Sequence, residues 1–584
     1  MSISPFKRFV EVINEERKDL VVLLIYTIFS GLFSLAIPLG AQVLVNTIAA
    51  ASGMFFRQLV VICVLVFIGL LFAGALDILR LFLIETLQRR IFVRIAFRLA
   101  RQMFRIRMSV LEEKYGPELV NRFFDTMTIQ KTWATILVSW PASILQIIIG
   151  MVLIGIYSPY FLGFDLFLIF VIFVVVALGR GGVWTSINES TEKYRVAHWL
   201  EELARCNTSF KMNGRYSFTI KHLDKKIVDY IYRRRVHFSI IVRQAFAGNM
   251  IQAVATTGIF AIGGWLVINQ QLTIGQLVAA ELVIVIILAS LKRIIKQVDD
   301  FYDLLTGLHK IETVMELPCE RDQGVISAGY RGGMEIVCRK IHFSYHTDHP
   351  IIFDLNLEIY SGERVSLVGE SGCGKTTLAY LFCGLYETER GLIDINKTSI
   401  QKLDLNRHRR NIALVSGPNQ LFDGTIEENI ILGREYIPKH DVDWAIEFVE
   451  LDRDLALLPK GLQTHIISEG LNISMGQRLR ILIAREIVEK PQLLILDEAF
   501  NGTDEKTKLK ILDNLLDKKL KWTVINITED AEVVVKTDIV HVLQDGQIVE
   551  SGSSEELAGS SSSMFSTLFP ELIKQIRKKH VQGE

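Results

Sequence analysis

The fold of the C-terminal half of this chain is decided by one stretch, Gly369-Glu370-Ser371-Gly372-Cys373-Gly374-Lys375-Thr376-Thr377. Its spacing is G-x-x-x-x-G-K-T, in which glycines let backbone N–H groups turn toward phosphate oxygens. Lys375 is then expected to reach the β- and γ-phosphates of a nucleotide, and the Thr376 hydroxyl to ligate Mg²⁺. We therefore predict that these residues form a phosphate-binding loop and contact the nucleotide.

The segments on either side of this loop fit that prediction. The apolar residues 365–368 have the length of a short buried strand, and residues 378–381 begin a helical pattern. A helix that starts directly after the loop directs the positive end of its dipole at a bound anion. The stretch thus predicts an α/β domain of the P-loop type.

A second pair of candidate residues follows another apolar strand. Residues 493–496 are Leu-Leu-Ile-Leu and run directly into Asp497 and Glu498, as expected where a buried parallel strand delivers side chains at its carboxyl end. There, Asp497 would hold Mg²⁺ through water and Glu498 would polarise the attacking water. Taken alone, the pair also fits a solvated strand end. Its position after a phosphate-binding loop favours the catalytic interpretation.

The composition of the whole chain narrows its environment and partners. Half of the residues are hydrophobic, which indicates membrane spans. The 64 basic and 64 acidic residues cancel, so no overall positive field favours nucleic acid. The six cysteines are scattered without CxxC spacing, which predicts neither a disulfide framework nor a zinc site.

The N-terminal half contains six charge-poor segments that are long enough to cross a hydrocarbon layer of roughly 30 Å at about 1.5 Å per residue. They lie within residues 20–56 and at about residues 59–76, 133–156, 161–178, 245–268 and 274–291. The arginine-rich continuation of the second span, residues 77–107, is cytoplasmic by the positive-inside rule. An even number of spans then places both termini in the cytoplasm.

These patterns divide the chain into parts that differ in hydrophobicity and in expected secondary structure. We predict a polytopic α-helical membrane domain of six spans at residues 1–310, a linker at 311–333 and an α/β P-loop ATPase domain at 334–584. Within the last span, Glu281 is the single charged residue. A charge inside a span is a candidate for binding a cationic group of the cargo or relaying a proton, and the alternatives are an interhelical hydrogen bond or a position shallow enough to reach water.

Further motifs resemble those of the ATP-binding-cassette superfamily, and the resemblance covers nearly the whole chain. Residues 472–478, Asn-Ile-Ser-Met-Gly-Gln-Arg, are similar to the family signature LSGGQ. Asp504 matches the aspartate of the family's D-loop, and Tyr345 matches the aromatic residue that stacks on adenine. Without this context, Tyr345 would be interpreted as a core aromatic at a strand edge. Six spans ahead of the cassette resemble an exporter half-transporter.

The resemblance implies a dimer as well as a set of nucleotide contacts. Two cassettes of the family meet head to tail, so Ser474, Gly476 and Gln477 are expected to contact the nucleotide that the other chain's loop holds. The implied cofactors are ATP and Mg²⁺. The implied partners are a second half-transporter, identical or different, the lipid bilayer and an unidentified transported substrate, with no nucleic acid. The implied location is the plasma (inner) membrane, as a multi-pass protein.

Three positions depart from the family pattern. Gly417 stands where the family has a glutamine that contacts Mg²⁺ and water, and Gln420 follows three residues later. Met475 replaces the first glycine of the signature, and Glu529 replaces a histidine that hydrogen-bonds the γ-phosphate. Two like charges about 4 Å apart at an effective dielectric near 20 cost roughly 4 kcal/mol. Glu529 must therefore turn away, be protonated or weaken the site.

The departures affect groups that sense the γ-phosphate and leave the groups that hold it. We therefore expect an ATP-driven exporter half-transporter that binds ATP at a composite dimer interface and hydrolyses it slowly. Its catalytic residues would be Glu498 and Lys375. The alternative is a nucleotide-gated regulatory or partner subunit with little ATPase activity of its own.

Overall fold

The computed structural model describes residues 5–49, 55–114, 116–157, 159–325, 332–345, 349–417, 420–500, 504–559, 563–574 and 576. The chain forms two compact units, one of residues 1–106 and 113–318 and the other of residues 107–112 and 319–584. The predicted linker, residues 311–333, begins within helix α13 (Val298–Met315). Its residues 326–331 lie outside the described residues. The proposed domain boundaries stay a prediction.

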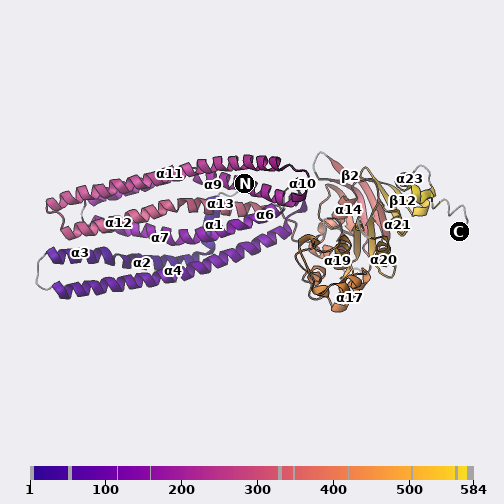
Figure 1. The fold of residues 1–584 in the computed structure, drawn as a ribbon, viewed down its shortest axis with the longest axis horizontal. Coiled ribbons are helices and arrows are strands. Elements are labelled where there is room, and N and C mark those ends of the chain that lie inside the picture. The colour runs from indigo at the N-terminus through magenta and orange to yellow at the C-terminus, as the bar shows by residue number, and fades with distance from the viewer. Residues whose placement is uncertain are drawn as a thin grey trace. The chain divides into compact units, whose positions relative to one another are not determined.

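The first unit consists of helices, most of which run side by side in one long bundle (Figure 1). In chain order they are α1 (Pro5–Glu15), α2 (Arg17–Ser34), α3 (Ala36–Ala49), α4 (Phe55–Arg105), α6 (Gly116–Asn121), η1 (Arg122–Phe124), α7 (Asp125–Tyr157), α8 (Phe161–Leu178), α9 (Gly182–Arg205), α10 (Asn207–Met212), α11 (Tyr216–Ile268), α12 (Ile274–Lys296) and α13 (Val298–Met315). The short helix α5 (Met108–Glu113) lies where the sequence passes between the two units.

Six segments of the described helices are long and apolar enough to cross a membrane. They are Arg17–Ile48, Phe56–Arg105, Glu118–Tyr157, Phe161–Arg205, Tyr216–Ile268 and Ile274–Met315. This confirms the predicted polytopic helical domain. The predicted continuation of the second span is present too, because α4 is one helix of 51 residues.

The first span differs from a single continuous helix. It consists of α2 and α3, which are separated at Leu35. Pro38 has no N–H to donate to the carbonyl of Ser34, and its ring would clash with that carbonyl in a continuous helix. Proline is tolerated in the first turn of a new helix, so the chain restarts at Ala36.

Close packing of α7 and α12 shows how the bundle core is built. A Cβ atom added at Gly150 would lie 2.7 Å from Cγ1 of Ile287, so the two helices approach this closely only because residue 150 has no side chain. Ile287 is fully buried there. On the same helix, Glu281 is half-buried and makes no hydrogen bond or ion pair with any described residue. Its contact with cargo stays a prediction.

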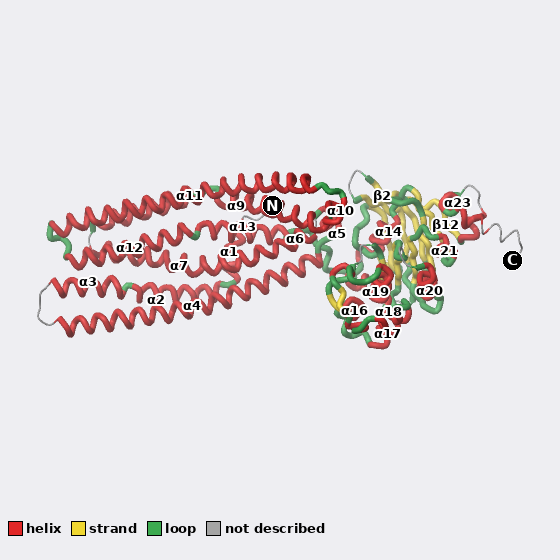
Figure 2. The backbone as a smooth tube through the Cα atoms, viewed as in Figure 1, coloured by secondary structure: helices red, strands yellow, loops and turns green. Residues whose placement is uncertain are grey.

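The second unit is built on β-sheets (Figure 2). Its strands are β1 (Ile336–Ser344), β2 (Pro350–Ile359), β3 (Arg364–Val368), β4 (Arg390–Ile395), β5 (Thr398–Ser399), β6 (Ile412–Val415), β7 (Gly424–Thr425), β8 (His465–Ile466), β9 (Leu493–Asp497), β10 (Thr523–Ile527), β11 (Ile539–Gln544) and β12 (Gln547–Gly552). One six-stranded sheet has the order β12-β11-β3-β10-β9-β6, and a four-stranded sheet has the order β2-β1-β4-β5. This confirms a sheet-containing P-loop domain.

Helices and short helical turns pack around these sheets. They are α14 (Lys375–Phe382), η2 (Ile400–Lys402), α15 (Leu405–Arg410), α16 (Ile426–Ile431), α17 (Lys439–Phe448), α18 (Asp452–Leu457), η3 (Gly461–Gln463), η4 (Ser468–Gly470), α19 (Met475–Ile487), α20 (Glu505–Leu516), α21 (Ala531–Val535), α22 (Ser554–Gly559) and α23 (Met564–Leu568). Two large apolar clusters form the core and together include residues of β3, β9 and β10.

The arrangement of three strands positions the candidate site. Strand β10 lies between β3 and β9 and is parallel to both. All residues of the three strands are buried, which explains why their sequences are mostly apolar. Their carboxyl ends therefore meet at one edge of the sheet. Gly369, Glu498 and Thr528 each follow directly after one of these strands.

Candidate nucleotide-binding site

The predicted phosphate-binding loop connects the end of β3 to the start of α14, and its backbone needs glycine at two positions. Gly374 caps α14 with φ +110°, a left-handed conformation that residues with a side chain rarely adopt. A Cβ atom at Gly369 would lie 2.2 Å from the carbonyl oxygen of Leu543. Between these glycines, Glu370, Ser371 and Gly372 are exposed and Cys373 is half-buried, and Thr377 is buried in α14.

The loop lysine is held by its own loop. Lys375 is 6% exposed, and its Nζ donates to the carbonyl oxygens of Gly369 at 2.7 Å and Glu370 at 2.9 Å. A third neighbour is the Glu529 carboxylate, whose Oε1 lies 3.7 Å from the same Nζ. The ammonium therefore lies at the mouth of the loop between backbone dipoles and one carboxylate.

A cavity of about 480 Å³ brings several predicted site residues together. Thr376, Asp497 and Glu498 line it, and so do two of the three departures from the family pattern, Gly417 and Met475. The remaining lining residues were not predicted from the sequence: Tyr380, Val415, Ser416, Arg478, Leu479, Leu482 and Ala499. Tyr380 could have been found, because residues four apart share one face of a helix and Thr376 precedes it by four.

The two candidate metal ligands, Thr376 and Asp497, line the same cavity. Burial raises the pKa of Asp497 above its ordinary value, and the nearby Glu498 carboxylate raises it further. A hydrogen bond with Thr376 and the positive charge of Lys375 act in the opposite direction. A hydroxyl and a buried carboxylate thus share one point of the cavity, the kind of oxygen pair that holds Mg²⁺.

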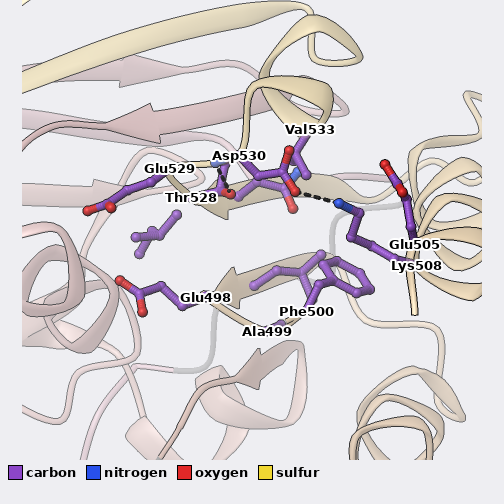
Figure 3. Close-up of a pocket in the computed structure, with 12 residues that line it drawn as sticks. Glu498, Ala499, Phe500, Glu505, Lys508, Thr528, Glu529, Asp530 and Val533 are labelled. Atoms are coloured by element: carbon purple, nitrogen blue, oxygen red, sulfur yellow. Dashed lines mark hydrogen bonds and ion pairs between the residues drawn. The ribbon is translucent and has the colours of Figure 1, made fainter. Parts of the chain in front are cut away.

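Glu529 does not turn away from the site. Its side chain is 63% exposed and its carboxylate faces Lys375. Figure 3 shows the Glu498 and Glu529 carboxylates on one side of a neighbouring cavity of about 400 Å³, with Lys508 and Asp530 on the other side. Lys508 Nζ and Asp530 Oδ2 form an ion pair at 2.6 Å. In this structure the Glu529 carboxylate therefore lies toward Lys375, and its response to a bound nucleotide stays a prediction.

The loop around Gly417 gives no substitute for the expected glutamine among its described residues. Ser416 and Gly417 line the 480 Å³ cavity, and Gln420 does not. Gln420 is exposed, and its carbonyl oxygen accepts a hydrogen bond of 3.1 Å from Arg485. Residues 418–419 lie outside the described residues.

Tyr345 lies beside α14, and its contacts fit both roles considered for it, an aromatic of the core and a residue that stacks on adenine. Its hydroxyl is 3.1 Å from Oγ1 of Thr377, which places it next to α14. Its ring also packs edge-on against Phe343 and Tyr386, with centroid distances of 5.0 and 5.2 Å. Half-buried in this aromatic cluster, Tyr345 is a core residue as well as a candidate contact for adenine.

The signature segment forms the start of α19. Ser474 caps this helix through a capping box: its Oγ accepts from the Gln477 backbone N–H, and the Gln477 side chain accepts from the Ser474 backbone N–H. Gln477 also donates to Asp454 at 2.9 Å. Within the described residues, the side chains of Ser474 and Gln477 thus form hydrogen bonds inside their own chain. Met475 is 64% exposed, and a Cβ atom on Gly476 would meet no other atom within 4 Å.

Asp504 caps α20, the helix that follows β9 in the chain. Its Oδ2 accepts from the Thr507 backbone N–H at 2.9 Å, and this interaction lowers the pKa of the exposed carboxyl. Residues 501–503, which precede it, lie outside the described residues. Within this chain, Asp504 caps a helix. Its side chain is exposed, so a second chain could also contact it.

The residues present fit ATP and Mg²⁺. The loop has the close backbone approach and left-handed glycine that a phosphate cradle needs. Lys375 supplies positive charge, and Thr376 and Asp497 supply oxygen ligands suited to Mg²⁺. The helical membrane unit and this nucleotide site together define an ATP-binding membrane protein.

Comparisons with known proteins identify the family. A sequence profile described as "ABC transporter" matches residues 352–501, and one described as "ABC transporter transmembrane region" matches residues 20–291. The chain belongs to the ABC transporter family and has the exporter arrangement of six membrane helices followed by a nucleotide-binding domain.

Similar proteins share this arrangement along most of the chain. Leukotoxin translocation ATP-binding protein LktB of Mannheimia haemolytica is 28% identical over 576 residues, which cover 96% of this chain and 79% of LktB. Transport/processing ATP-binding protein ComA of Streptococcus pneumoniae is 26% identical over 483 residues, covering 82% of this chain and 66% of ComA. The structure of a bacterial Atm1-family ABC exporter with ATP bound has the same fold, with a TM-score of 0.86, 20% identity and coverage of 95% of this chain and 99% of that one.

Proposed function

We propose that this chain is an exporter half-transporter that works as a dimer, binds ATP at a composite interface and hydrolyses it slowly. One observation carries the proposal. Thr376, Asp497 and Glu498 line the same cavity as Gly417, which offers no side chain. The groups that would hold the nucleotide and its metal are present, whereas a group that would sense the terminal phosphate is missing.

The residues divide the work as follows. Bound ATP and Mg²⁺ supply the phosphoryl group and the charge neutralisation that its transfer requires. Lys375 would hold the β- and γ-phosphates, and Thr376 and Asp497 would hold the metal. Glu498 would orient and polarise the attacking water as the general base. Tyr345 would contact the adenine from its position beside α14.

Slow hydrolysis follows from two positions. Gly417 leaves its wall of the cavity without an amide that could position water or metal. Glu529 places a carboxylate, rather than a hydrogen-bond-donating imidazole, next to Lys375. Neither change removes the general base, so hydrolysis is slowed and not abolished.

The exposed signature and D-loop residues support dimerisation. Ser474 and Asp504 are exposed, and Gly476 has open space beside it. A second cassette could therefore bring its nucleotide against these residues. We propose that the dimer spans the plasma membrane with both termini in the cytoplasm. Export as the direction of transport is supported by relatives such as LktB, whose name describes translocation.

The second candidate is a regulatory or partner subunit that binds nucleotide and hydrolyses little. The ion pair between Lys375 and Glu529 favours this candidate, because a paired lysine is less available to phosphate. Purification in mild detergent separates the two cases. A different cassette chain with glutamine and histidine at the positions of Gly417 and Glu529 would support the partner subunit.

Steady-state ATPase activity of the purified full chain in lipid nanodiscs tests the main proposal. We expect turnover below about 0.1 per second, under the low end for enzymes, and a further loss in the Glu498→Gln variant. Turnover of tens per second that Glu498→Gln abolishes would contradict slow hydrolysis.

A further inference from the structure

The pairing of Lys375 with Glu529 follows from the order of strands in the sheet. Lys375 begins α14 after the loop that leaves β3, and Glu529 lies two residues beyond Ile527, the last residue of β10. Because β10 is the direct neighbour of β3, the two segments leave the same edge of the sheet side by side. The fold itself therefore brings the Glu529 carboxylate to the mouth of the phosphate-binding loop.

One carboxylate, that of Glu529, contacts the ammonium of Lys375, and Asp497 interacts with it from farther away. The Glu529 Oε1 lies 3.7 Å from Nζ, and among the described residues no other carboxylate lies within 4.0 Å of it. The other contacts of Nζ are the carbonyl oxygens of Gly369 and Glu370. Because Lys375 is 6% exposed, its charge is poorly hydrated, and the Glu529 carboxylate is the counter-ion nearest to it among the described residues.

We propose that Glu529 is a specificity-determining residue: its carboxylate competes with the γ-phosphate for Lys375 and so weakens the preference of the site for a nucleoside triphosphate over a diphosphate. This inference rests on the proposed nucleotide-binding function and deepens it. A lysine at this place in a phosphate-binding loop reaches the β- and γ-phosphates. A carboxylate within 4 Å of that lysine therefore occupies the space beside the terminal phosphate.

The effect should discriminate between ligands rather than weaken all of them equally. A diphosphate ends at its β-phosphate, whereas a triphosphate adds charge on the side where Glu529 lies. The side chain of Glu529 is 63% exposed, so water screens part of the repulsion. Coulomb repulsion over about 4 Å, between the limits for water and for a protein surface, then corresponds to roughly tenfold to hundredfold in relative affinity.

The test measures dissociation constants of ATP and ADP by isothermal titration calorimetry on the full chain in nanodiscs, with Mg²⁺ omitted so that ATP is not consumed. The variants are Glu529→Gln, which removes the charge and keeps the shape, and Lys375→Ala. Glu532→Gln is the matched control. It removes one charge three residues away, from a carboxylate that pairs with Lys508 at 3.7 Å instead of Lys375.

We expect the wild-type chain to bind ATP and ADP with similar affinity, and Glu529→Gln to shift the ratio toward ATP by roughly tenfold to hundredfold. Glu532→Gln should leave the ratio within about twofold. An unchanged ratio in Glu529→Gln overturns the inference and leaves the proposed function intact. So does a wild-type chain that already prefers ATP by more than about tenfold, a readout that needs no variant. If neither nucleotide binds, or Lys375→Ala binds as tightly as wild type, the proposed function fails and the inference with it.

Discussion

Arg485 of α19 fixes Asn429 of α16 with two hydrogen bonds, one of 2.8 Å to the backbone oxygen and one of 3.1 Å to the side-chain oxygen. A third bond of 3.1 Å reaches the carbonyl oxygen of Gln420. Arg485 is 7% exposed, and Asn429 is fully buried. The helix that begins with the signature segment is thus tied to the loop that carries the altered glutamine position.

Replacing this arginine should destabilise the chain. Arg485→Met removes the donor from the backbone oxygens of Asn429 and Gln420, while the Asn429 side-chain oxygen keeps the Phe422 N–H, and we expect a cost of about 3 kcal/mol. We expect a fall in melting temperature of roughly 5 °C or more by differential scanning fluorimetry of the full chain. The control is Arg453→Met, whose side chain is 76% exposed and should matter little. Equal melting temperatures for the two variants would show that these hydrogen bonds do not stabilise the fold.

Restoring a side chain at Gly417 should speed hydrolysis. A Cβ atom at this position would meet no other atom within 4 Å, so Gly417→Gln fits without displacing a neighbour. The added amide can reach into the cavity that Asp497 and Glu498 line. We expect turnover to rise about tenfold or more, since positioned polar groups contribute at least that much to proton transfer and water attack. Gly559→Gln, at another open glycine, is the control. No increase would mean that Gly417 does not limit the rate.

Replacing the carboxylate of Glu529 should also speed ATP hydrolysis. Glu529→His removes a charge 3.7 Å from Lys375 and supplies an N–H donor. Steady-state ATPase activity should rise by about tenfold, and more when the change is combined with Gly417→Gln. Glu532→His serves as the control. A Glu529→His chain that is as slow as the wild type would remove Glu529 from the explanation of slow hydrolysis.

Stability in acid should depend on His541. Burial lowers the pKa of this imidazole from 6.5 to about 4, so between these values the unfolded chain binds a proton that the folded chain does not. The stability is therefore complete above pH 6.5 and is lost as the pH falls toward 4, by up to about 3 kcal/mol. Urea unfolding of the full chain across this range should show a steeper loss for wild type than for His541→Gln. Parallel curves would contradict the assignment.

Much of the fold could be predicted because its signals are local. Charge-free runs of about twenty residues predicted the spans, and the sequences of residues 365–368 and 493–496 predicted the buried strands β3 and β9, which lead into candidate site residues. The division of the first span at Leu35 was missed, although Pro38 could have indicated it. A helical period alone does not show where one apolar helix ends and the next begins.

The candidate site could be predicted in its motifs but not in its contacts. The loop and the Asp497–Glu498 pair follow from spacing, whereas the approach of Glu529 to Lys375 depends on the order of strands in the sheet. The spacing of Ser474 and Gln477 also has the S-x-x-Q form of a capping box, a local signal that the family resemblance obscured. Sequence motifs report which chemistry is available, and topology decides which groups meet.

This chain should hold ATP more readily than it hydrolyses it. The most direct measurement loads the full chain in nanodiscs with radiolabelled ATP, adds Mg²⁺ and follows the bound nucleotide by chromatography as triphosphate or diphosphate. We predict that bound ATP persists for tens of seconds or longer, with a conversion rate below about 0.1 per second. Conversion of most bound ATP within about one second, at the rate of an ordinary enzyme, would contradict slow hydrolysis by this chain.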